Sequence, residues 1–297
     1  MHQFFEGFYF KQQTALETIA VIPAIHADRN GCHTASIQVI TDTGSDMVKY
    51  PADAFCVDRK HLKIRVGHNQ FSRKGMRLNI EKKGLYVAGT LLFDTICSPR
   101  YDIMGPFAYV PFLECRHSVL SLRHNVNGIL QVNDRKLRFQ DAVGYIEGDR
   151  GRSFPKRYLW TQCNFGMHNS LMLSVAEIPL MGTQFIGIIG VVLLNGQEYR
   201  IATYCGAKIQ SMQGGCVRVR QGTLSLTATL LTRKEQSLHA PVLGDMTRII
   251  RESVACRVQY RLEQNGHVLL DVTCDRAGFE YEWKREDLHL AHPSLML

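Results

Sequence analysis

The chain has 297 residues, of which 45% are apolar and 21% are charged. This balance is typical of a folded protein, and it argues against a disordered chain. The formal net charge is +8 at pH 7, and the longest apolar run is Phe185–Leu194. Because that run is too short to cross a bilayer as a helix but suits a strand buried on both faces, we expect a soluble protein.

Alternation of apolar and polar residues with a period of two dominates the chain and predicts strands. In chain order, the predicted strands cover residues 17–25, 34–40, 63–67, 76–80, 85–93, 128–132, 171–178, 185–194, 216–221, 223–231, 256–262 and 267–274. Helical periodicity is weak and favours only two short segments, 52–55 and 242–253. The pattern therefore predicts an antiparallel all-β architecture, with a sandwich and a barrel as the alternatives.

The second half of the chain resembles the first. Four pairs of segments match in the same order: 8–13 with 158–163, 15–23 with 171–179, 76–93 with 216–232, and 129–151 with 260–283. The first match aligns Phe10 with Trp160 and Gln12 with Gln162. A single match between alternating strands is weak evidence, but four in one order are stronger. We therefore expect two tandem antiparallel β-domains, residues 1–151 and 152–297, joined near the segment "RSFPKR".

The nine cysteines form no C-x-x-C pair and are spread along the chain. This usage predicts reduced thiols in a cytoplasmic protein, without a disulfide framework or a metal site. The first residues show no basic segment followed by an apolar one, so we also expect no secretory signal.

The positive charge is concentrated between residues 59 and 83, where Glu81 is the single acid among many lysines and arginines. Alternation in this window predicts strands with a basic outer face. A solvated sheet face is one interpretation, and transient contact with an anionic membrane surface is the other. We expect no nucleic-acid partner, since the window contains no recognisable binding module or stacking pattern.

Several well-known catalytic motifs are absent. The chain has no G-x-S-x-G elbow, no Walker A loop, no G-x-G-x-x-G and no H-E-x-x-H, which removes most support for hydrolase, nucleotide-binding and zinc-protease functions. Polar residues beside aromatic residues are the remaining candidates. By alternation they fall on three predicted strands and one loop: Glu6, Phe8, Phe10 and Gln12; Tyr145, Glu147 and Asp149; Tyr158, Trp160, Gln162 and Asn164; and Asp102 with His117 in the loop region 101–119.

Each of these residues also has a structural interpretation. Glu147 or Asp149 could simply pair with Arg150 or Arg116 across a junction between domains, because ion-pair networks also bury charges.

Taken together, these segments resemble the tocopherol cyclase family. The resemblance rests on "EGFYFK" (6–11), "GHNQFS" (67–72), "MGPFAYVPFLECRH" (104–117), "GYIEGDRGRSFPKRYLWTQCNF" (144–165) and "HAPVLGDMTRIIRESVACRVQYRL" (239–262), in family order over nearly the whole chain. The element "SFPKRYLWTQCNF" is the most specific of them. The resemblance implies two lipocalin-like β-domains, as barrels or sandwiches, which agrees with the repeat.

The resemblance also implies a reaction. Plant members of the family protonate the alkene nearest the ring of a prenylated benzoquinol, and a phenolic oxygen then captures the tertiary cation to close a chromanol ring. No metal or organic cofactor is needed. The step requires a strong acid, a group that binds the phenol, and a water-free pocket whose aromatic faces stabilise the cation.

On this resemblance, roles are implied for ten residues. Glu147 or Asp149 would be the acid, with Glu6 and Asp102 as substitutes, and His117 would orient or deprotonate the phenol. Phe8, Tyr145 and Trp160 would line the pocket, while Gln162 and Asn69 would hold the quinol oxygens.

The sequence departs from the plant pattern, because it shows no plastid transit peptide and has Phe or Tyr where plant members have Trp, as at Phe8. It is closer to a bacterial cytoplasmic relative, whose substrate would be a prenylated or another amphipathic, hydrophobic small molecule. Two hypotheses remain: a cyclase of the intramolecular-lyase type, and a non-catalytic lipocalin-like binding protein.

Overall fold

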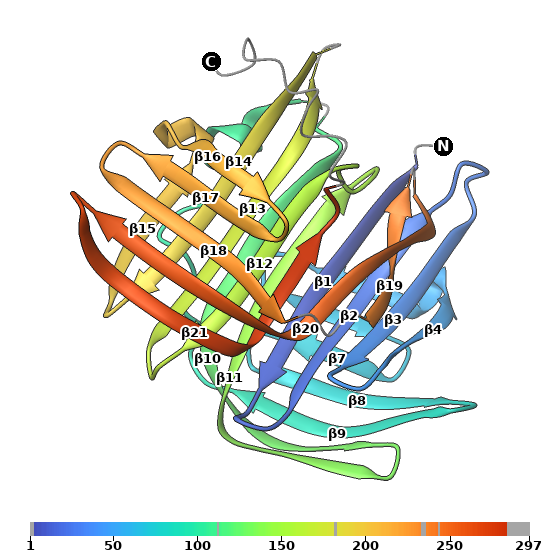
Figure 1. The fold of residues 1–297 in the computed structure, drawn as a ribbon. Coiled ribbons are helices and arrows are strands. Elements are labelled where there is room, and N and C mark those ends of the chain that lie inside the picture. The colour runs from blue at the N-terminus through green and yellow to red at the C-terminus, as the bar shows by residue number, and fades with distance from the viewer. Residues whose placement is uncertain (1–2, 112, 181–182, 233–235, 243, 284–297) are drawn as a thin grey trace. The chain divides into compact units, whose positions relative to one another are not determined.

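The computed structural model describes residues 3–111, 113–180, 183–232, 236–242 and 244–283. The described part of the chain is almost entirely antiparallel sheet, and its only helices are the short 3-10 segments η1 (Ala52–Ala54), η2 (Gly105–Tyr109) and η3 (Thr203–Cys205) (Figure 1). No helix in the described ranges is both long and apolar enough to cross a membrane. The predicted all-β class is confirmed.

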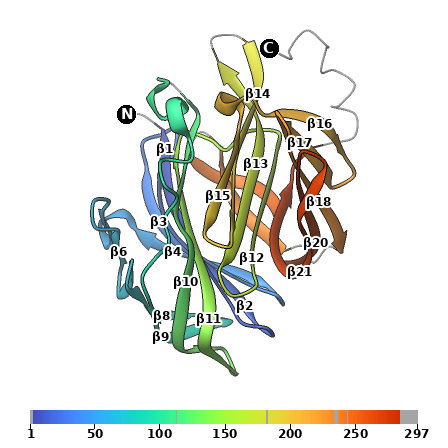
Figure 2. The ribbon, with the colours of Figure 1, turned by 90° about the vertical axis from the view of Figure 1, so that its left-hand side faces the viewer.

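The first sheet contains the strands of the first half of the chain. They are β1 (Phe4–Gln13), β2 (Thr18–Ala27), β3 (His33–Thr41), β4 (Ser45–Pro51), β5 (Phe55–Asp58), β6 (Lys63–Val66), β7 (Asn69–Ser72), β8 (Gly75–Lys82), β9 (Leu85–Phe93), β10 (Cys115–Val132) and β11 (Arg135–Gly151). Their order across the sheet is β4-β3-β2-β1-β11-β10-β9-β8-β7-β6-β5. The long strands β10 and β11 pair along most of their length (Figure 2).

The second sheet contains the strands of the second half. They are β12 (Tyr158–Phe165), β13 (Asn169–Leu180), β14 (Thr183–Leu194), β15 (Gln197–Ala202), β16 (Lys208–Gln213), β17 (Cys216–Gln221), β18 (Leu224–Thr232), β20 (Asp245–Gln264) and β21 (His267–Tyr281), with β19 (Gln236–Val242) paired to β20. Their order is β15-β14-β13-β12-β21-β20-β18-β17-β16.

The two sheet orders confirm the repeat inferred from the sequence. The matched segments β1 and β12, β2 and β13, β8–β9 and β17–β18, and β10–β11 and β20–β21 occupy equivalent places in the two sheets. The residue match in the first pair is wrong by one position, however. Phe10 belongs to the core cluster of its sheet, whereas the residues of β12 that face the second core are Leu159, Cys163 and Phe165. A slip of one residue exchanges the two faces of a strand, so Trp160 is not the counterpart of Phe10.

Contacts divide the chain into two compact units that are not continuous halves. Unit 1 comprises residues 1–100, 115–154 and 236–249, and unit 2 comprises 101–114, 155–235 and 250–297. Strand β11 ends at Gly151 and β12 begins at Tyr158, so the predicted linker lies between two strands. Segment 101–114 lies in the first half of the chain but belongs to unit 2, and segment 236–249 lies in the second half but belongs to unit 1. The predicted boundary between residues 151 and 152 therefore stays a prediction.

One short prediction was wrong and one was partly right. Residues 52–54 form a single 3-10 turn, in agreement with the weak helical signal there, but residues 245–264 form strand β20 rather than a helix. Pairing of β20 with both β18 and β21 satisfies its backbone groups, and this outweighs a marginal helical periodicity.

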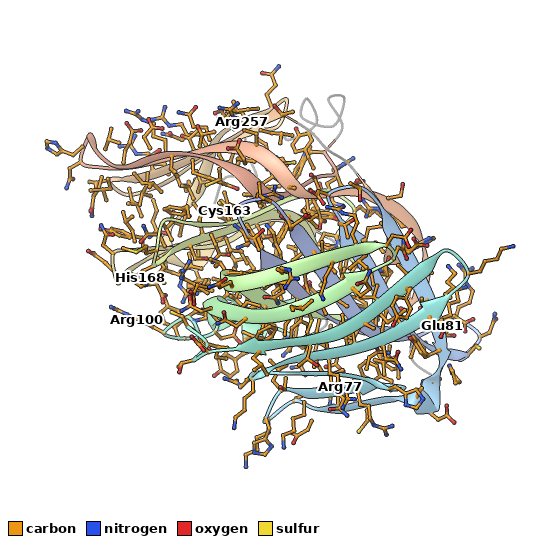
Figure 3. The ribbon with its side chains drawn as sticks, turned by 90° about the horizontal axis from the view of Figure 1, so that it is seen from below. Arg77, Glu81, Arg100, Cys163, His168 and Arg257 are labelled. Atoms are coloured by element: carbon orange, nitrogen blue, oxygen red, sulfur yellow. The ribbon has the colours of Figure 1, made fainter. Side chains whose placement is uncertain are left out.

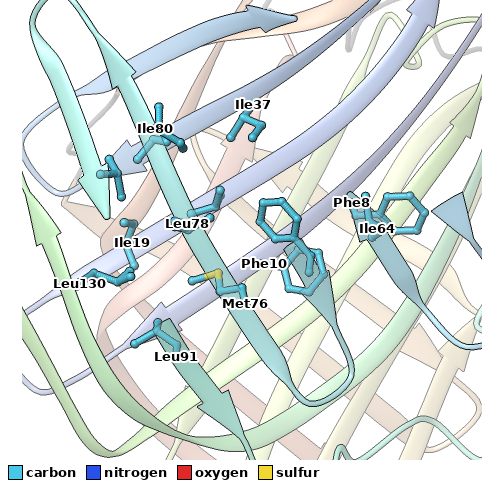
Figure 4. Packing of buried hydrophobic residues seen from close by; sticks show 14 of the residues in the cluster. Phe8, Phe10, Ile19, Ile37, Ile64, Met76, Leu78, Ile80, Leu91 and Leu130 are labelled. Carbon is cyan, nitrogen blue, oxygen red and sulfur yellow. The ribbon is translucent and has the colours of Figure 1, made fainter. Parts of the chain in front are cut away.

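Alternating burial gives unit 1 its core. In β6 and β8 every second side chain is buried, and the others are exposed or partly exposed. The buried side chains of β1, β2, β3 and β6–β11 form one cluster, part of which is shown in Figure 4: Phe8, Phe10, Ile19, Ile37, Ile64, Met76, Leu78, Ile80, Leu91 and Leu130. We call the side of the first sheet that carries this cluster its core face and the opposite side its outer face.

Candidate active site

The pairing of β10 with β11 brings three of the predicted site residues together on the outer face of unit 1. His117 lies directly opposite Asp149 in the register of the two strands, and directly opposite residues of an antiparallel pair share a face. Tyr145, Glu147 and Asp149 alternate along β11, so they share that face too. The predicted grouping of Tyr145, Glu147 and Asp149 is confirmed, and His117 joins them.

These side chains form a linear chain of contacts. The Tyr145 hydroxyl donates a hydrogen bond to Glu147 Oε2 at 2.7 Å, and Glu147 Oε2 lies 3.3 Å from His117 Nε2. The other ring nitrogen, His117 Nδ1, lies 3.0 Å from Asp149 Oδ1. The imidazole ring therefore bridges two carboxylates, one at each nitrogen.

Burial rises along this chain from Asp149 to Tyr145. The Asp149 side chain is 21% exposed, His117 12% and Glu147 7%, while Tyr145 is fully buried. Asp149 is therefore the member that a bound molecule can reach most easily. The thiol of Cys115, two residues before His117 on β10, lies 3.5 Å from Asp149 Oδ1.

The electrostatics favour a charged His117. Burial alone would lower the pKa of His117, but the negative charges of Asp149 and Glu147 outweigh burial, and the pKa lies well above its ordinary value. Burial, reinforced by the charge of Glu147, raises the pKa of Tyr145 well above its ordinary value. At neutral pH the arrangement is thus an imidazolium between two carboxylates, with a neutral phenol as hydrogen-bond donor.

The same residues could offer ligands to a metal ion, because one donor atom from each of His117, Glu147 and Asp149 lies within 4.8 Å of the others. A metal ion binds only one nitrogen of an imidazole, and ligating histidines usually give the other nitrogen to a hydrogen bond. Here the two carboxylates contact opposite nitrogens. The geometry therefore fits a bound proton better than a bound metal.

The other predicted residues of unit 1 have different environments. Glu6 lies on the core face and forms a two-pronged ion pair with Arg59, from Nε to Oε1 at 2.6 Å and from Nη2 to Oε2 at 2.5 Å. Phe8 belongs to the core cluster. The Asn69 side chain donates to the Val66 carbonyl and accepts from the Asn79 N–H, so it ties two strands together. The structure does not bring these three residues into the His117 cluster, and their implied roles stay predictions.

Three predicted residues belong to unit 2. Asp102 Oδ1 accepts the Met104 N–H at 2.8 Å and shapes the turn before η2. Trp160 lies across Gly278 of β21, with a ring atom 2.7 Å from the position that a Cβ would occupy. Gln162 donates to Asn164 Oδ1 at 2.6 Å. All three keep their roles only as predictions.

A second polar cluster lies on the core face of unit 1, and the sequence candidates include only one of its members, Gln12. His124 and Gln12 are buried there around Gly144, where a Cβ would overlap both His124 Nε2 and Gln12 Oε1. Among the described residues, neither these two atoms nor Gln12 Nε2 has a hydrogen-bond partner. Only the register that opposes His124 to Gly144 reveals the cluster, and alternation in the sequence gives no such register.

The fold and this site define an all-β protein with two antiparallel units and a partly buried acid–base chain on one strand pair. The sequence profile of the Tocopherol cyclase-like family matches residues 91–281, and the chain belongs to this family. No curated protein matches the chain by sequence.

Several solved structures have a similar fold. A putative AttH from Nitrosomonas europaea has a TM-score of 0.55 at 11% identity, over 96% of this chain and 94% of its own. Kievitone hydratase from Nectria haematococca has 0.55 at 10%, over 94% and 89%. CghA in complex with Sch210972 has 0.62 at 10%, over 95% and 89%. At such identities the likeness shows the fold, and the predicted class of two antiparallel lipocalin-like β-domains is confirmed.

Proposed function

We propose that this protein is an enzyme that protonates an alkene in a hydrophobic, prenylated quinol and closes a chromanol ring without a cofactor. Family membership supports an enzyme that acts on a hydrophobic small molecule. The observation that carries the proposal is the His117 ring held between the carboxylates of Glu147 and Asp149. This arrangement places the Asp149 carboxyl, as the proposed proton donor, beside the fixed positive charge of His117.

When a hydrophobic substrate covers Asp149 and excludes water, the neutral form of this carboxyl is favoured, and Asp149 takes up a proton from solution. In the proposed first step, Asp149 gives this proton to the alkene carbon, and a tertiary cation forms. Asp149 is the most exposed carboxylate of the chain of contacts, so we place it against the substrate. The charge that develops on Asp149 is stabilised by the adjacent imidazolium, because preorganised charges near a reacting group act strongly where water is excluded. Glu147 keeps His117 charged, and the Tyr145 hydroxyl orients Glu147.

In the second step, the phenolic oxygen attacks the tertiary cation and forms the C–O bond. The phenolic proton then passes to the Asp149 carboxylate, which restores the starting state, so that the reaction consumes no proton overall. His117 already carries its proton, so it has no free lone pair to act as the base in this state. We therefore assign His117 to charge stabilisation rather than to deprotonation of the phenol.

The test is incubation of the pure protein with a prenylated benzoquinol in D2O under reducing conditions, followed by mass spectrometry. A cyclase gives a chromanol that carries one carbon-bound deuterium, from the proton that the acid delivers. Asp149→Asn should reduce turnover by at least about a hundredfold, the usual effect of losing a general acid. Asp94→Asn is the matched control, because Asp94 is exposed in the same unit, and it should retain full activity.

The products distinguish the alternatives. A product heavier than the substrate by one water would mean that water captures the cation, and it would replace the cyclase with a hydratase. A tightly bound but unchanged quinol would favour the non-catalytic binding protein. Full activity of Asp149→Asn would remove Asp149 from the mechanism.

A further inference from the structure

The outer face of unit 1 carries, away from the acid–base chain, a surface that the basic window only partly predicts. Side chains there project outward from six neighbouring strands, β6 to β11, and we call this surface the basic face. Its defining residues are Lys63, Arg65, Arg77, Lys136 and Arg138, together with Leu92 and Ile129, and all seven are exposed. Figure 3 labels Arg77 on it.

Strand register assembles this surface from distant parts of the sequence. Arg65 pairs with Gln70, and Gln70 pairs with Arg77. Arg77 pairs with Thr90, Thr90 with Ile129, and Ile129 with Arg138. Directly paired residues share a face, so three arginines and an isoleucine lie in one row across six strands.

Acidic side chains on this face are few. Apart from Glu147 and Asp149, the described strands β6–β11 contain two acids, Glu81 of β8 and Asp141 of β11, and both are exposed. If the basic face carried only charged side chains, a sheet face exposed to solvent would explain it.

The basic face also exposes aliphatic side chains beside the arginines. Leu92 is 63% exposed and Ile129 is 38% exposed. Leu92 pairs with Asn127, two residues before Ile129, so the two apolar side chains are diagonal neighbours on adjacent strands. Single exposed apolar residues are ordinary, but an adjacent pair flanked by Arg77 and Arg138 suggests a partner that is both anionic and apolar.

We propose that the basic face docks on an anionic lipid bilayer. Lipid phosphates would contact Arg65, Arg77 and Arg138, while Leu92 and Ile129 would enter the interface between head groups and acyl chains. A nucleic acid would satisfy the arginines but would leave the aliphatic pair in water. The outer face continues along β10 and β11 to Asp149, so docking would hold the same sheet face that carries the proposed active site against the source of a lipid substrate.

Vesicle co-sedimentation of the full chain tests the proposal. The protein should sediment with vesicles of phosphatidylcholine mixed with phosphatidylglycerol and should stay in solution with pure phosphatidylcholine. The double variant Arg77→Glu/Arg138→Glu should weaken capture by at least about twentyfold, since each basic residue near an anionic surface contributes about fivefold. The matched control is Lys208→Glu/Arg220→Glu, which makes the same change in net charge at two exposed positions of unit 2 and should bind like the wild type.

The apolar pair has its own signature. The double variant Leu92→Ser/Ile129→Ser should still sediment with anionic vesicles at low salt. At high salt it should sediment less than the wild type, because salt screens charges but does not weaken apolar burial. Equal capture by neutral vesicles, an equal loss in the control variant, or binding of single-stranded RNA that depends on Arg77 and Arg138 would overturn the proposal. Cyclisation measured in detergent without vesicles is independent of docking, so failure of this proposal and failure of the proposed reaction are distinguishable.

Discussion

Strand β10 carries two histidines with little exposure whose protonation is opposite. His117 lies on the outer face between Glu147 and Asp149, and its pKa is raised well above the ordinary value. His124 lies on the core face, and burial, reinforced by the positive charge of Arg123, lowers its pKa to about 3. Both rings have little exposure and lie on the same strand, so the carboxylates, rather than burial, decide which of them is charged.

Hydrogen bonds also fix the neutral form of His124. Ser121 Oγ donates its single proton to the Arg123 carbonyl at 2.9 Å, so it can only accept from His124 Nδ1, which lies 3.0 Å away. The proton of the neutral ring is therefore on Nδ1, and Nε2 is a bare acceptor. The outer face of the sheet thus holds a charged imidazolium, His117, and the core face holds a neutral imidazole, His124.

Linkage gives the two rings opposite effects on stability. The pKa of His117 is raised by folding, so its contribution is fully present below about pH 6.5 and is lost as the pH rises through the pKa of the folded state. The pKa of His124 is lowered by folding, so its neutral form costs nothing above about pH 6.5 and becomes a penalty as the pH falls toward about 3.

The largest effect on turnover should come from a substitution that lowers the pKa of His117 toward that of the neutral His124. Glu147→Gln removes the negative charge at His117 Nε2 but keeps an amide that Tyr145 can contact. We expect the pKa of His117 to fall and turnover of the quinol to drop about a hundredfold, because less positive charge then stabilises the charge that develops on Asp149. Nitrogen NMR of the His117 ring measures the first effect and the deuterium assay measures the second. An unchanged pKa of His117 would show that Asp149 alone holds the charge.

The next effect concerns the space around His124. Gly144→Ala places a Cβ on top of His124 Nε2 and Gln12 Oε1, so the neighbours must move, and overpacking of this kind costs about 1–3 kcal/mol of unfolding free energy. Chemical denaturation measures the loss. Gly44→Ala is the control, since a Cβ there meets nothing within 4 Å, and it should change stability by less than about 0.5 kcal/mol. Equal stability of the two variants would mean that the Gln12–His124 cluster is looser than the structure shows.

Sequence alone reaches the fold and half of the site. Period-two alternation predicts which residues of β11 share a face, and therefore groups Tyr145, Glu147 and Asp149 without any structure. It cannot predict that His117 lies opposite Asp149, because β10 and β11 pair through three register shifts between Val119 and Gly128. Each shift adds a residue to one strand and so changes which residues lie opposite each other, and no local sequence pattern predicts where a shift occurs.

The same limit explains Glu6 and Trp160. Alternation correctly places Glu6 with Phe8 on one face of β1, but its partner Arg59 arrives from the turn between β5 and β6. The sequence repeat correctly identifies β12 as the counterpart of β1, but it aligns the two strands with an error of one residue, which predicts the wrong face for Trp160. Strand identity is encoded locally, whereas register is decided by partners far away in the sequence.

A smaller effect should appear on the acid side of the stability curve. Between about pH 6.5 and pH 5.5 the neutral His124 costs stability with a slope that approaches about 1.4 kcal/mol per pH unit. In His124→Phe this slope should be reduced by that amount, whatever the variant's absolute stability. Urea unfolding at several pH values gives the slope directly. Identical slopes in variant and wild type would mean that His124 is charged in the folded protein, and the contrast with His117 would disappear.

The smallest effect separates the hydrogen bond at the end of the acid–base chain from the charges within it. Tyr145→Phe removes the hydroxyl that donates to Glu147 Oε2 and leaves every charge of the cluster in place. Loss of one such bond to a charged group costs about 1.5–3 kcal/mol of local interaction free energy, but His117 remains between two carboxylates. We therefore expect turnover to fall by no more than about tenfold and the pKa of His117 to stay raised. If Tyr145→Phe were as damaging to turnover as Glu147→Gln while the His117 resonances stayed unchanged, the phenol itself would contact the substrate, and Tyr145 would be a catalytic residue rather than a support for Glu147.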